Sequence, residues 1–448
     1  MANKDVLLLQ QPLKDGGIRS VNFFNGRLLS GKDFSREQAA RREADARLGL
    51  ATGDGVAFGL EVARDTDLDQ AAAPVLRIRA GLAVNRLGQT LRLMGDVSVA
   101  LTRGFDAQSA DCVFASCTPL KGGTYVAGAG VYLLTIAPAG TSEGRAASNG
   151  LDPANVACNS DAMVEALQFR LIGVSALRFA GLDPSSPQFR NRLAYRCFGI
   201  EAREASAIDP WRVDAPSYGL IDELRDVGLD DRDVPLALLF WTAAGLQFVD
   251  TWAARRALLA PDALSGFSFQ RDPLKGDDLS SFAFIARRRA LVEAQAMCAQ
   301  FQEHLADVLA EAANPMGVAA TDRFRYLPPF GIVPLRSGPL RGFDEAGFFT
   351  GVVRPPRPGS TAGTPFIDAR LLGTLQALAL SAAPTDLGLP QGQKEFIRVY
   401  RPWQNAKAIA DSRPVQPMLA FASGLVPDLG TARFDMARFD YANYAGCC

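Results

Sequence analysis

The sequence predicts a fold that is mainly β with some α: several small antiparallel β domains, a charged amino-terminal helix and one long helix at about 280–313. Three observations predict this class. Short segments of alternating apolar and polar residues recur along the chain, which is typical of strands with one buried face. Two longer segments have the composition and length of helices. The chain of 448 residues is also too long for one ordinary core, so several packed units are expected.

Residues 1–54 are expected to form an amino-terminal docking segment followed by a helix. The dipeptide Asn25-Gly26 favours a tight turn. The oxygen atoms of Ser30 and Asp33 can cap the helix that follows. The turn is flanked by two apolar pairs, which are the candidate anchors of the docking segment: Phe23, Phe24, Leu28 and Leu29.

The predicted helix, from about residue 33 to 51, carries charge around most of its surface. Its apolar side consists of only Phe34, Ala40, Ala44 and Leu48. Burial of so narrow a side within its own domain contributes little stability. We therefore expect the helix to be solvated or paired with a neighbouring subunit, with charged contacts through Arg41, Arg42 and Glu43.

Residues 55–105 are expected to form a small antiparallel β domain. Apolar and polar residues alternate over 56–62 and again over 76–84, with a turn at 85–88 that leads into a further strand. This arrangement predicts strands with one buried face, two of them joined as a hairpin.

Residues 106–260 are expected to form a central β domain. Strand patterns occur at 130–136 and 164–172, and a loop rich in glycine, asparagine and serine is predicted at 140–159. The clearest hairpin of the chain is predicted at 234–252, where two apolar runs flank a short turn.

The remaining chain is predicted to contain a linker with the long helix at 261–320 and a proline-rich β domain with a tail at 321–448. The long helix ends before Asn314-Pro315, because proline disfavours helical backbone in the residue before it. Strand character returns at 395–400.

Composition and charge exclude several classes of partner. A hydrophobic content of 48% with 21% charged residues is typical of a globular protein, and a net charge of -1 gives no electrostatic reason to bind nucleic acid. The longest apolar run, 235–244, is too short to cross a bilayer, so membrane insertion is not expected. No signal peptide is visible, which predicts synthesis in the cytoplasm and no export by the general secretory route. The seven cysteines lack zinc spacing and predict free thiols.

One short motif suggests a hydrolase. Residues Gly140–Gly144 match the G-x-S-x-G pattern of a nucleophile elbow, with Ser142 as nucleophile and the single histidine, His304, downstream. An elbow requires a helix directly after the serine, whereas loop residues follow here. His304 is predicted to lie on the surface of the long helix. We therefore expect no serine hydrolase and no other enzyme.

Metal and cofactor sites are also not expected. Asp65, Asp67 and Asp69 imitate the start of a calcium loop, but Gln70 stands where glycine is required and Leu76 where the bidentate glutamate belongs. Paired carboxylates for glycoside hydrolysis leave no local spacing signature. A module that binds or cleaves carbohydrate therefore remains the alternative, and a grouped aromatic platform beside two carboxylates would favour it. The tryptophans that could build such a platform are Trp211, Trp241, Trp252 and Trp403.

Several stretches carry a resemblance to a known family. Residues 23–29 read Phe-Phe-Asn-Gly-Arg-Leu-Leu, and after the charged helix residues 55–62 read Gly-Val-Ala-Phe-Gly-Leu-Glu-Val. Further similar stretches lie at 81–88, 234–256 and 327–334. Together they resemble an uncharacterised family encoded near phage-tail-like contractile injection systems. The resemblance implies a structural or accessory protein associated with the baseplate, fibre or cap. It also implies assembly in the cytoplasm and release with the particle by lysis.

The sequence thus predicts a non-enzymatic structural component of a phage-tail-like contractile particle that acts through protein–protein contacts. The expected partners are other subunits of the particle (baseplate, tube, sheath or fibre proteins) and further copies of the chain in a homo-oligomer. The docking segment supplies the apolar anchors, because an exposed apolar segment gains stability when a neighbour covers it. A second candidate contact is the aromatic tail, with Phe434, Phe439, Tyr441 and Tyr444.

Overall fold

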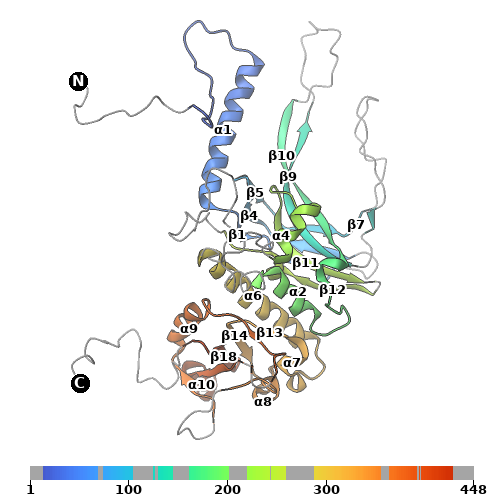
Figure 1. The fold of residues 1–448 in the computed structure, drawn as a ribbon, viewed down its shortest axis with the longest axis vertical. Coiled ribbons are helices and arrows are strands. Elements are labelled where there is room, and N and C mark those ends of the chain that lie inside the picture. The colour runs from blue at the N-terminus through green and yellow to red at the C-terminus, as the bar shows by residue number, and fades with distance from the viewer. Residues whose placement is uncertain are drawn as a thin grey trace, which may run out of the picture.

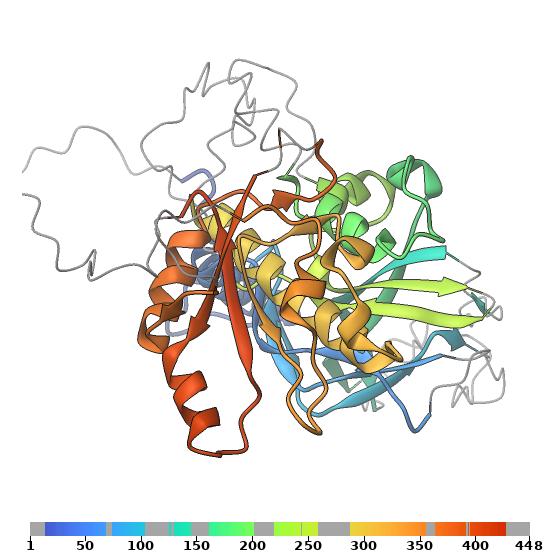
Figure 2. The same cartoon turned by 90° about the horizontal axis from the view of Figure 1, so that it is seen from below.

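The computed structural model describes residues 14–68, 74–103, 125–126, 130–144, 161–200, 219–242, 244–258, 287–354, 363–390, 393 and 395–426. The fold of these residues is mainly β with α, built from several small antiparallel sheets and two long helices (Figures 1 and 2). This confirms the predicted fold class. None of the helices within the described ranges has the length and apolar content needed to cross a bilayer.

The amino-terminal helix α1 (Gly31–Thr52) stands beside the body of the protein, and its first turn lies at the end that points away from it (Figure 1). A reciprocal capping box begins it: Ser30 Oγ accepts from the backbone N–H of Asp33 at 3.3 Å, and Asp33 Oδ2 accepts from that of Ser30 at 3.0 Å. The helix ends at Gly53, whose φ of 95° suits glycine. The sequence predicted this helix and its cap from local residues alone.

Two small antiparallel sheets follow α1. The strand orders are β1-β4-β5 and β2-β3-β6. The strand bounds are β1 Gly55–Gly59, β2 Val62–Arg64, β3 Val75–Ile78, β4 Gly81–Val84, β5 Thr90–Leu93 and β6 Val97–Ala100. A further short pair joins β7 (Thr102–Arg103) to β8 (Tyr125–Val126).

A four-stranded antiparallel sheet with the order β10-β9-β11-β12 forms the centre of the protein. The bounds are β9 Gly130–Glu143, β10 Ala162–Val174, β11 Val234–Thr242 and β12 Gly245–Asp250. Neighbouring residues of these strands face opposite cores. Leu133 and Leu238 pack on one side, whereas Leu134 and Leu239 pack against the small sheets on the other. Successive side chains of a strand point to opposite faces, and here both sets are apolar and buried. Both faces of the sheet are therefore covered.

Helices cover the first of these faces. They are η1 Ala176–Phe179, α2 Phe189–Cys197, α4 Gly219–Glu223, η2 Leu224–Val227 and α5 Thr251–Ala254. The long helix α6 (Arg287–Glu311) continues this layer and passes into the carboxy-terminal part of the protein (Figure 1). Ala296 and Met297 of α6 belong to the core beneath the central sheet, while Phe301, Leu305 and Val308 belong to the next core. One helix thus contributes to both cores.

The carboxy-terminal part is a sheet with the order β14-β18-β17-β15 that packs beside α6 (Figure 2). A two-stranded pair, β13 with β16, lies next to it. The strand bounds are β13 Tyr326–Leu327, β14 Phe330–Pro334, β15 Phe366–Ile367, β16 Thr385–Asp386, β17 Ile397–Pro402 and β18 Met418–Ser423. The helix bounds are η4 Pro315–Gly317, α7 Ala320–Arg323, α8 Glu345–Phe348, η5 Ala369–Leu371, α9 Leu372–Ala379 and α10 Trp403–Ala410.

The structure corrects several local predictions. The alternating segments 56–62 and 76–84 are each divided between strands of two different sheets, the first between β1 and β2 and the second between β3 and β4. The loop predicted at 140–159 begins too early, because residues 140–143 remain extended in β9 and pair with residues 162–165 of β10. The predicted hairpin at 234–252 ends at Asp250, whose side chain accepts from Ala253 N and begins α5, so residues 251 and 252 are helical. Residues 145–160 and 259–286 lie outside the described ranges.

Candidate functional site

The docking segment predicted from the sequence is exposed around a turn. The backbone N–H of Arg27 donates to Phe24 O at 3.2 Å, and Gly26 has a φ of 90°. The exposed fractions of the four predicted anchors are 53% for Phe23, 63% for Phe24, 95% for Leu28 and 45% for Leu29. Side chains of this size and exposure are available to a partner, and all four lie within seven consecutive residues.

Two polar contacts hold the docking segment against α1. The backbone N–H of Val21 donates to Glu37 Oε2 at 2.9 Å, and Arg27 forms an ion pair with Asp33 at 2.6 Å. The segment and the helix are therefore one unit, which we call the arm (residues 14–52). The sequence predicted neither tether. Val21 and Glu37 lie 16 positions apart on opposite sides of the turn, and Arg27 and Asp33 lie six positions apart after it.

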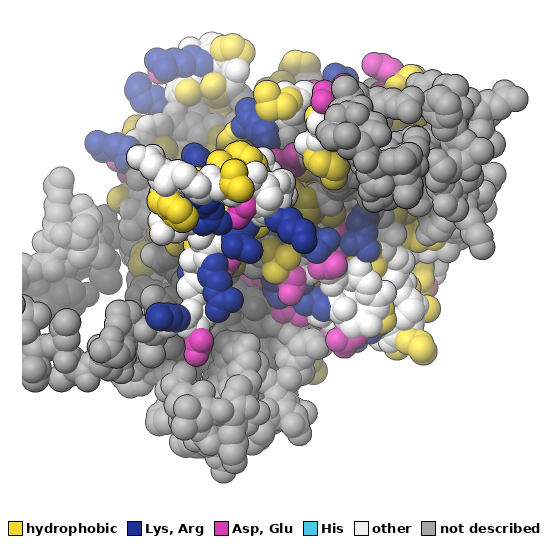
Figure 3. Space-filling model, turned by 90° about the horizontal axis from the view of Figure 1, so that it is seen from above, with side chains coloured by type: hydrophobic (Ala, Val, Ile, Leu, Met, Phe, Trp, Pro, Cys, Tyr) yellow, Lys and Arg dark blue, Asp and Glu magenta, His cyan; other side chains and the backbone are white. Residues whose placement is uncertain are grey.

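The predicted charged contacts of α1 are exposed, but they are not equivalent. Glu43 is paired with Arg47 at 2.6 Å, one helical turn further on. Arg41 and Arg42 form no ion pair with any other described residue and remain the stronger candidates for contact with a partner. Seen from above, Lys and Arg side chains gather on this face of the molecule, with hydrophobic side chains among them (Figure 3).

The base of the arm rests on the turn between β4 and β5. The backbones of Gly49 and Gly88 approach so closely that a Cβ atom on Gly49 would overlap the carbonyl group of Gly88. Only glycine permits this contact. The aromatic tail residues Phe434, Phe439, Tyr441 and Tyr444 lie outside the described ranges.

The residues of the hydrolase motif are not arranged as a nucleophile elbow. Ser142 lies within β9, opposite Met163 of β10, so the backbone around it is extended and paired. An elbow requires a sharp turn into a helix at this point.

His304 is buried, and the prediction that it lies on the helix surface is wrong. Its ring packs against Phe324, with ring centroids 4.7 Å apart, because this side of α6 faces the carboxy-terminal core. Burial, with Arg190 and Arg323 nearby, lowers the pKa of His304 well below its usual value. The side chain is therefore a neutral part of the packing around α6.

A buried ionic network, which the sequence did not reveal, joins α2, β12 and α6. Arg190 Nε donates to Asp250 Oδ2 at 2.8 Å, and the same guanidinium group pairs with Glu303 at 3.5 Å and with Asp307. Gln300 Nε2 donates to Asp250 Oδ2 at 2.8 Å. Because these residues are far apart in the sequence, no local spacing could have predicted the network.

The network predicts a pH dependence of stability. Burial and the neighbouring Asp250 carboxylate raise the pKa of Glu303 from 4.5 to about 8, although Arg190 and the Thr251 N–H oppose this. A raised folded-state pKa stabilises the fold at low pH, and this contribution is lost as the pH rises through the folded-state value. We expect the free energy of unfolding to fall between about pH 4.5 and pH 8, and Glu303→Gln to reduce the slope. Urea unfolding, monitored by circular dichroism at several pH values in this interval, measures how the free energy of unfolding depends on pH.

The control for this prediction is Glu311→Gln on the exposed last turn of α6. It should keep the pH slope of the unchanged protein. Equal slopes for Glu303→Gln and the unchanged protein would contradict the assignment of this pKa.

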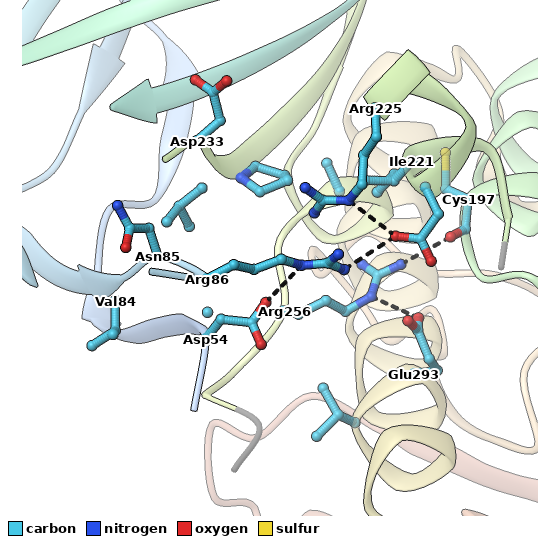
Figure 4. A pocket seen from close by; sticks show the side chains of 16 residues that line it. Asp54, Val84, Asn85, Arg86, Cys197, Ile221, Arg225, Asp233, Arg256 and Glu293 are labelled. Carbon is cyan, nitrogen blue, oxygen red and sulfur yellow. Dashed lines mark hydrogen bonds and ion pairs between the residues drawn. The ribbon is translucent and has the colours of Figure 1, made fainter. Parts of the chain in front are cut away.

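A cavity of about 170 Å³ lies between the β4–β5 turn, α4, η2, the start of β11 and α6. Asp54 and Gly55, which follow α1, also line it. Its polar lining includes three arginines that converge from different elements (Figure 4). They are Arg86 from the β4–β5 turn, Arg225 from η2 and Arg256 from the end of α5. No group of three or more metal-ligating side chains occurs among the described residues.

The described tryptophans do not form a common platform. Trp241 lies in the core between the central sheet and the small sheets, whereas Trp252 packs at the opposite core. Trp403 is exposed on α10 beside Phe366. The described tryptophans therefore do not build the platform that would favour the carbohydrate-binding alternative, and Trp211 lies outside the described ranges.

Compared with protein-family models and with curated proteins, the chain matches none of them.

Proposed function

We propose that the protein is a non-enzymatic structural component of a phage-tail-like contractile injection particle, and that the arm docks it onto a neighbouring subunit. The observation that carries the proposal is the exposure of Phe23, Phe24, Leu28 and Leu29 on a segment that is tethered to a helix with almost no buried face. The same segment resembles a family encoded near phage-tail-like contractile injection systems, and this resemblance supports an assembly of that kind.

The energetics of the arm support a docking role. Within α1 only Ala40 and Gly49 are buried, so the helix contributes little to the core of its own chain. Large apolar side chains in the centre of an interface commonly supply most of its binding free energy. The capping box and the two tethers hold the apolar anchors in place before binding, which lowers the entropy lost on association.

The charged face of α1 supports the same role. Arg41 and Arg42 can pair with carboxylates on a neighbour, which favours the correct partner and speeds association. We therefore propose an interface with an apolar centre around the turn and an ionic rim along the helix.

Loss of the anchors tests the proposal. The double variant Phe23→Ser/Phe24→Ser should abolish attachment to tail-like particles in native lysate, because both aromatic anchors are removed. Mass photometry and negative-stain imaging measure the attachment. The control is Leu177→Ser/Leu425→Ser, which changes two exposed apolar side chains far from the arm in the sequence and should attach normally.

Two outcomes would contradict the proposal. The first is an unchanged protein that remains a monomer and is never found with particles. The second is attachment of the Phe23→Ser/Phe24→Ser variant at the level of the control variant. In the first case, glycan arrays would test the carbohydrate-binding alternative.

A further inference from the structure

We propose that an exposed stripe of α1, formed by Phe34, Arg41, Asp45 and Leu48, binds the same stripe of a second copy of the chain. The two helices pack antiparallel about a two-fold axis. The inference rests on the proposed function, because it names the neighbouring subunit onto which the arm docks. It is carried by the apolar side chains of the stripe, by its two unpaired opposite charges and by the order in which these residues follow one another.

The α1 stripe runs along one side of the helix. Phe34, Arg41 and Leu48 are seven positions apart, and each step of seven turns by only about 20° around a helix. Asp45 is exposed one turn after Arg41. Phe34 is 54% exposed and Leu48 is 68% exposed, so two large apolar side chains face solvent near the two ends of the helix. The buried Ala40 marks a different side, which faces the rest of the arm.

The two charges of the α1 stripe are available to a neighbour. Arg41 and Asp45 are exposed, and neither side chain forms an ion pair or a hydrogen bond with another described residue. Glu43 and Arg47 have the same spacing and do pair, at 2.6 Å. There the acidic residue precedes the basic one, which is the more favourable order within a helix. Arg41 and Asp45 have the reverse order, which favours partners on another helix over each other.

The α1 stripe complements itself when a second copy runs in the opposite direction. Phe34 meets Leu48 of the second copy when the two-fold axis is level with position 41, and Arg41 meets Asp45 of the second copy when it is level with position 43. These levels differ by only about 3 Å along the helix, at about 1.5 Å per residue, so one arrangement allows both contacts. The symmetry repeats each contact, which gives two apolar pairs and two ion pairs in one isologous interface.

The same arrangement brings the docking anchors to the second copy. Because the helices run in opposite directions, the turn of each arm, with Phe23 and Phe24, lies beside the base of the other arm. That base rests on the β4–β5 turn, where Leu87 is 41% exposed. The apolar anchors therefore lie near an exposed apolar side chain of the second copy, which extends the interface beyond the two helices.

An exchange of charges between two variants tests the proposal. Sedimentation velocity of the full chain should show a dimer that dissociates on dilution. Arg41→Glu and Asp45→Arg each place like charges at both ion pairs, so each should weaken dimerisation at least about tenfold. An equimolar mixture of the two variants should form a heterodimer as tightly as the unchanged chain forms its dimer, because opposite charges then face each other again. Native mass spectrometry identifies the heterodimer when one variant carries a tag.

The matched control is Arg36→Glu. Arg36 is exposed on the same helix, about 140° around it from Arg41, and its replacement should leave the dimer unchanged. Circular dichroism checks that each variant folds, which is expected because all three positions are exposed. Recovery in the mixture also excludes misfolding as the cause of weak dimerisation, since a misfolded chain cannot pair.

A mixture that dissociates as readily as the single variants would overturn the proposal, and so would an unchanged chain that stays monomeric throughout the dilution series. Attachment to tail-like particles, measured on the same samples, separates this result from a failure of the proposed function. A monomer that attaches through Phe23 and Phe24 docks onto a different subunit, which overturns the self-association alone. A dimer that never attaches to particles contradicts the proposed particle and leaves the helix pairing in place.

Discussion

Replacement of Arg190 by methionine is expected to lower the free energy of unfolding by about 3–5 kcal/mol. Arg190 is 7% exposed, and Asp250, to which its Nε donates, is 0% exposed. Methionine resembles the aliphatic stem of arginine but has no donor and no charge, so the variant leaves a carboxylate buried without its cation. The cost arises from that unpaired charge, because the intact pair itself contributes little net stability. Urea unfolding followed by circular dichroism measures the change.

Two further variants separate this cause from a simple loss of packing. Arg192→Met lies on the same helix, on a partly exposed position, and should change the free energy of unfolding little. Arg190→Met/Asp250→Asn removes both charges and should recover a large part of the loss, because the buried carboxylate is gone. A double variant as unstable as Arg190→Met would contradict the explanation.

Replacement of Phe301 by alanine is expected to cost about 3–5 kcal/mol of unfolding free energy. Phe301 is fully buried on α6, where its ring contacts Phe324 at a centroid distance of 4.9 Å and Phe421 at 5.4 Å. Truncation removes these contacts and leaves a cavity that rigid neighbours fill only in part. Because α6 also carries Met297 of the other core, the loss should be transmitted to the central sheet.

Thermal unfolding monitored by tryptophan fluorescence measures this effect, because Trp241 and Trp252 report on the central sheet while Trp403 reports on the carboxy-terminal part. Phe366→Ala is the matched control, since Phe366 is about half exposed and should matter far less. A normal unfolding temperature for Phe301→Ala would show that the core around α6 can close over the lost ring.

The arm shows what local sequence can predict. Its turn, its cap at Ser30 and Asp33, and its exposed anchors all depend on residues within a few positions of one another. Turn and capping preferences act over that distance, and they were sufficient here. The alternating strands and the long helix were predicted for the same reason.

The wrong predictions depended on contacts between distant segments. Residues 140–143 have the composition of a loop, but pairing with β10 supplies hydrogen bonds that keep them extended. His304 has a polar side chain, which favours the helix surface, but the packing of α6 against Phe324 buries it. Tertiary contacts override local preference in both cases.

The sequence by itself therefore determined the fold class, the arm and the approximate positions of several strands, because periodicity and capping are local properties. Only the tertiary structure decided which side chains meet. Asp250 and Glu303 lie 60 and 113 positions from Arg190, yet they share its guanidinium group. The three arginines of the cavity likewise come from separate elements. Charges that are distant along the chain become partners only when the packing of apolar surfaces brings their elements together.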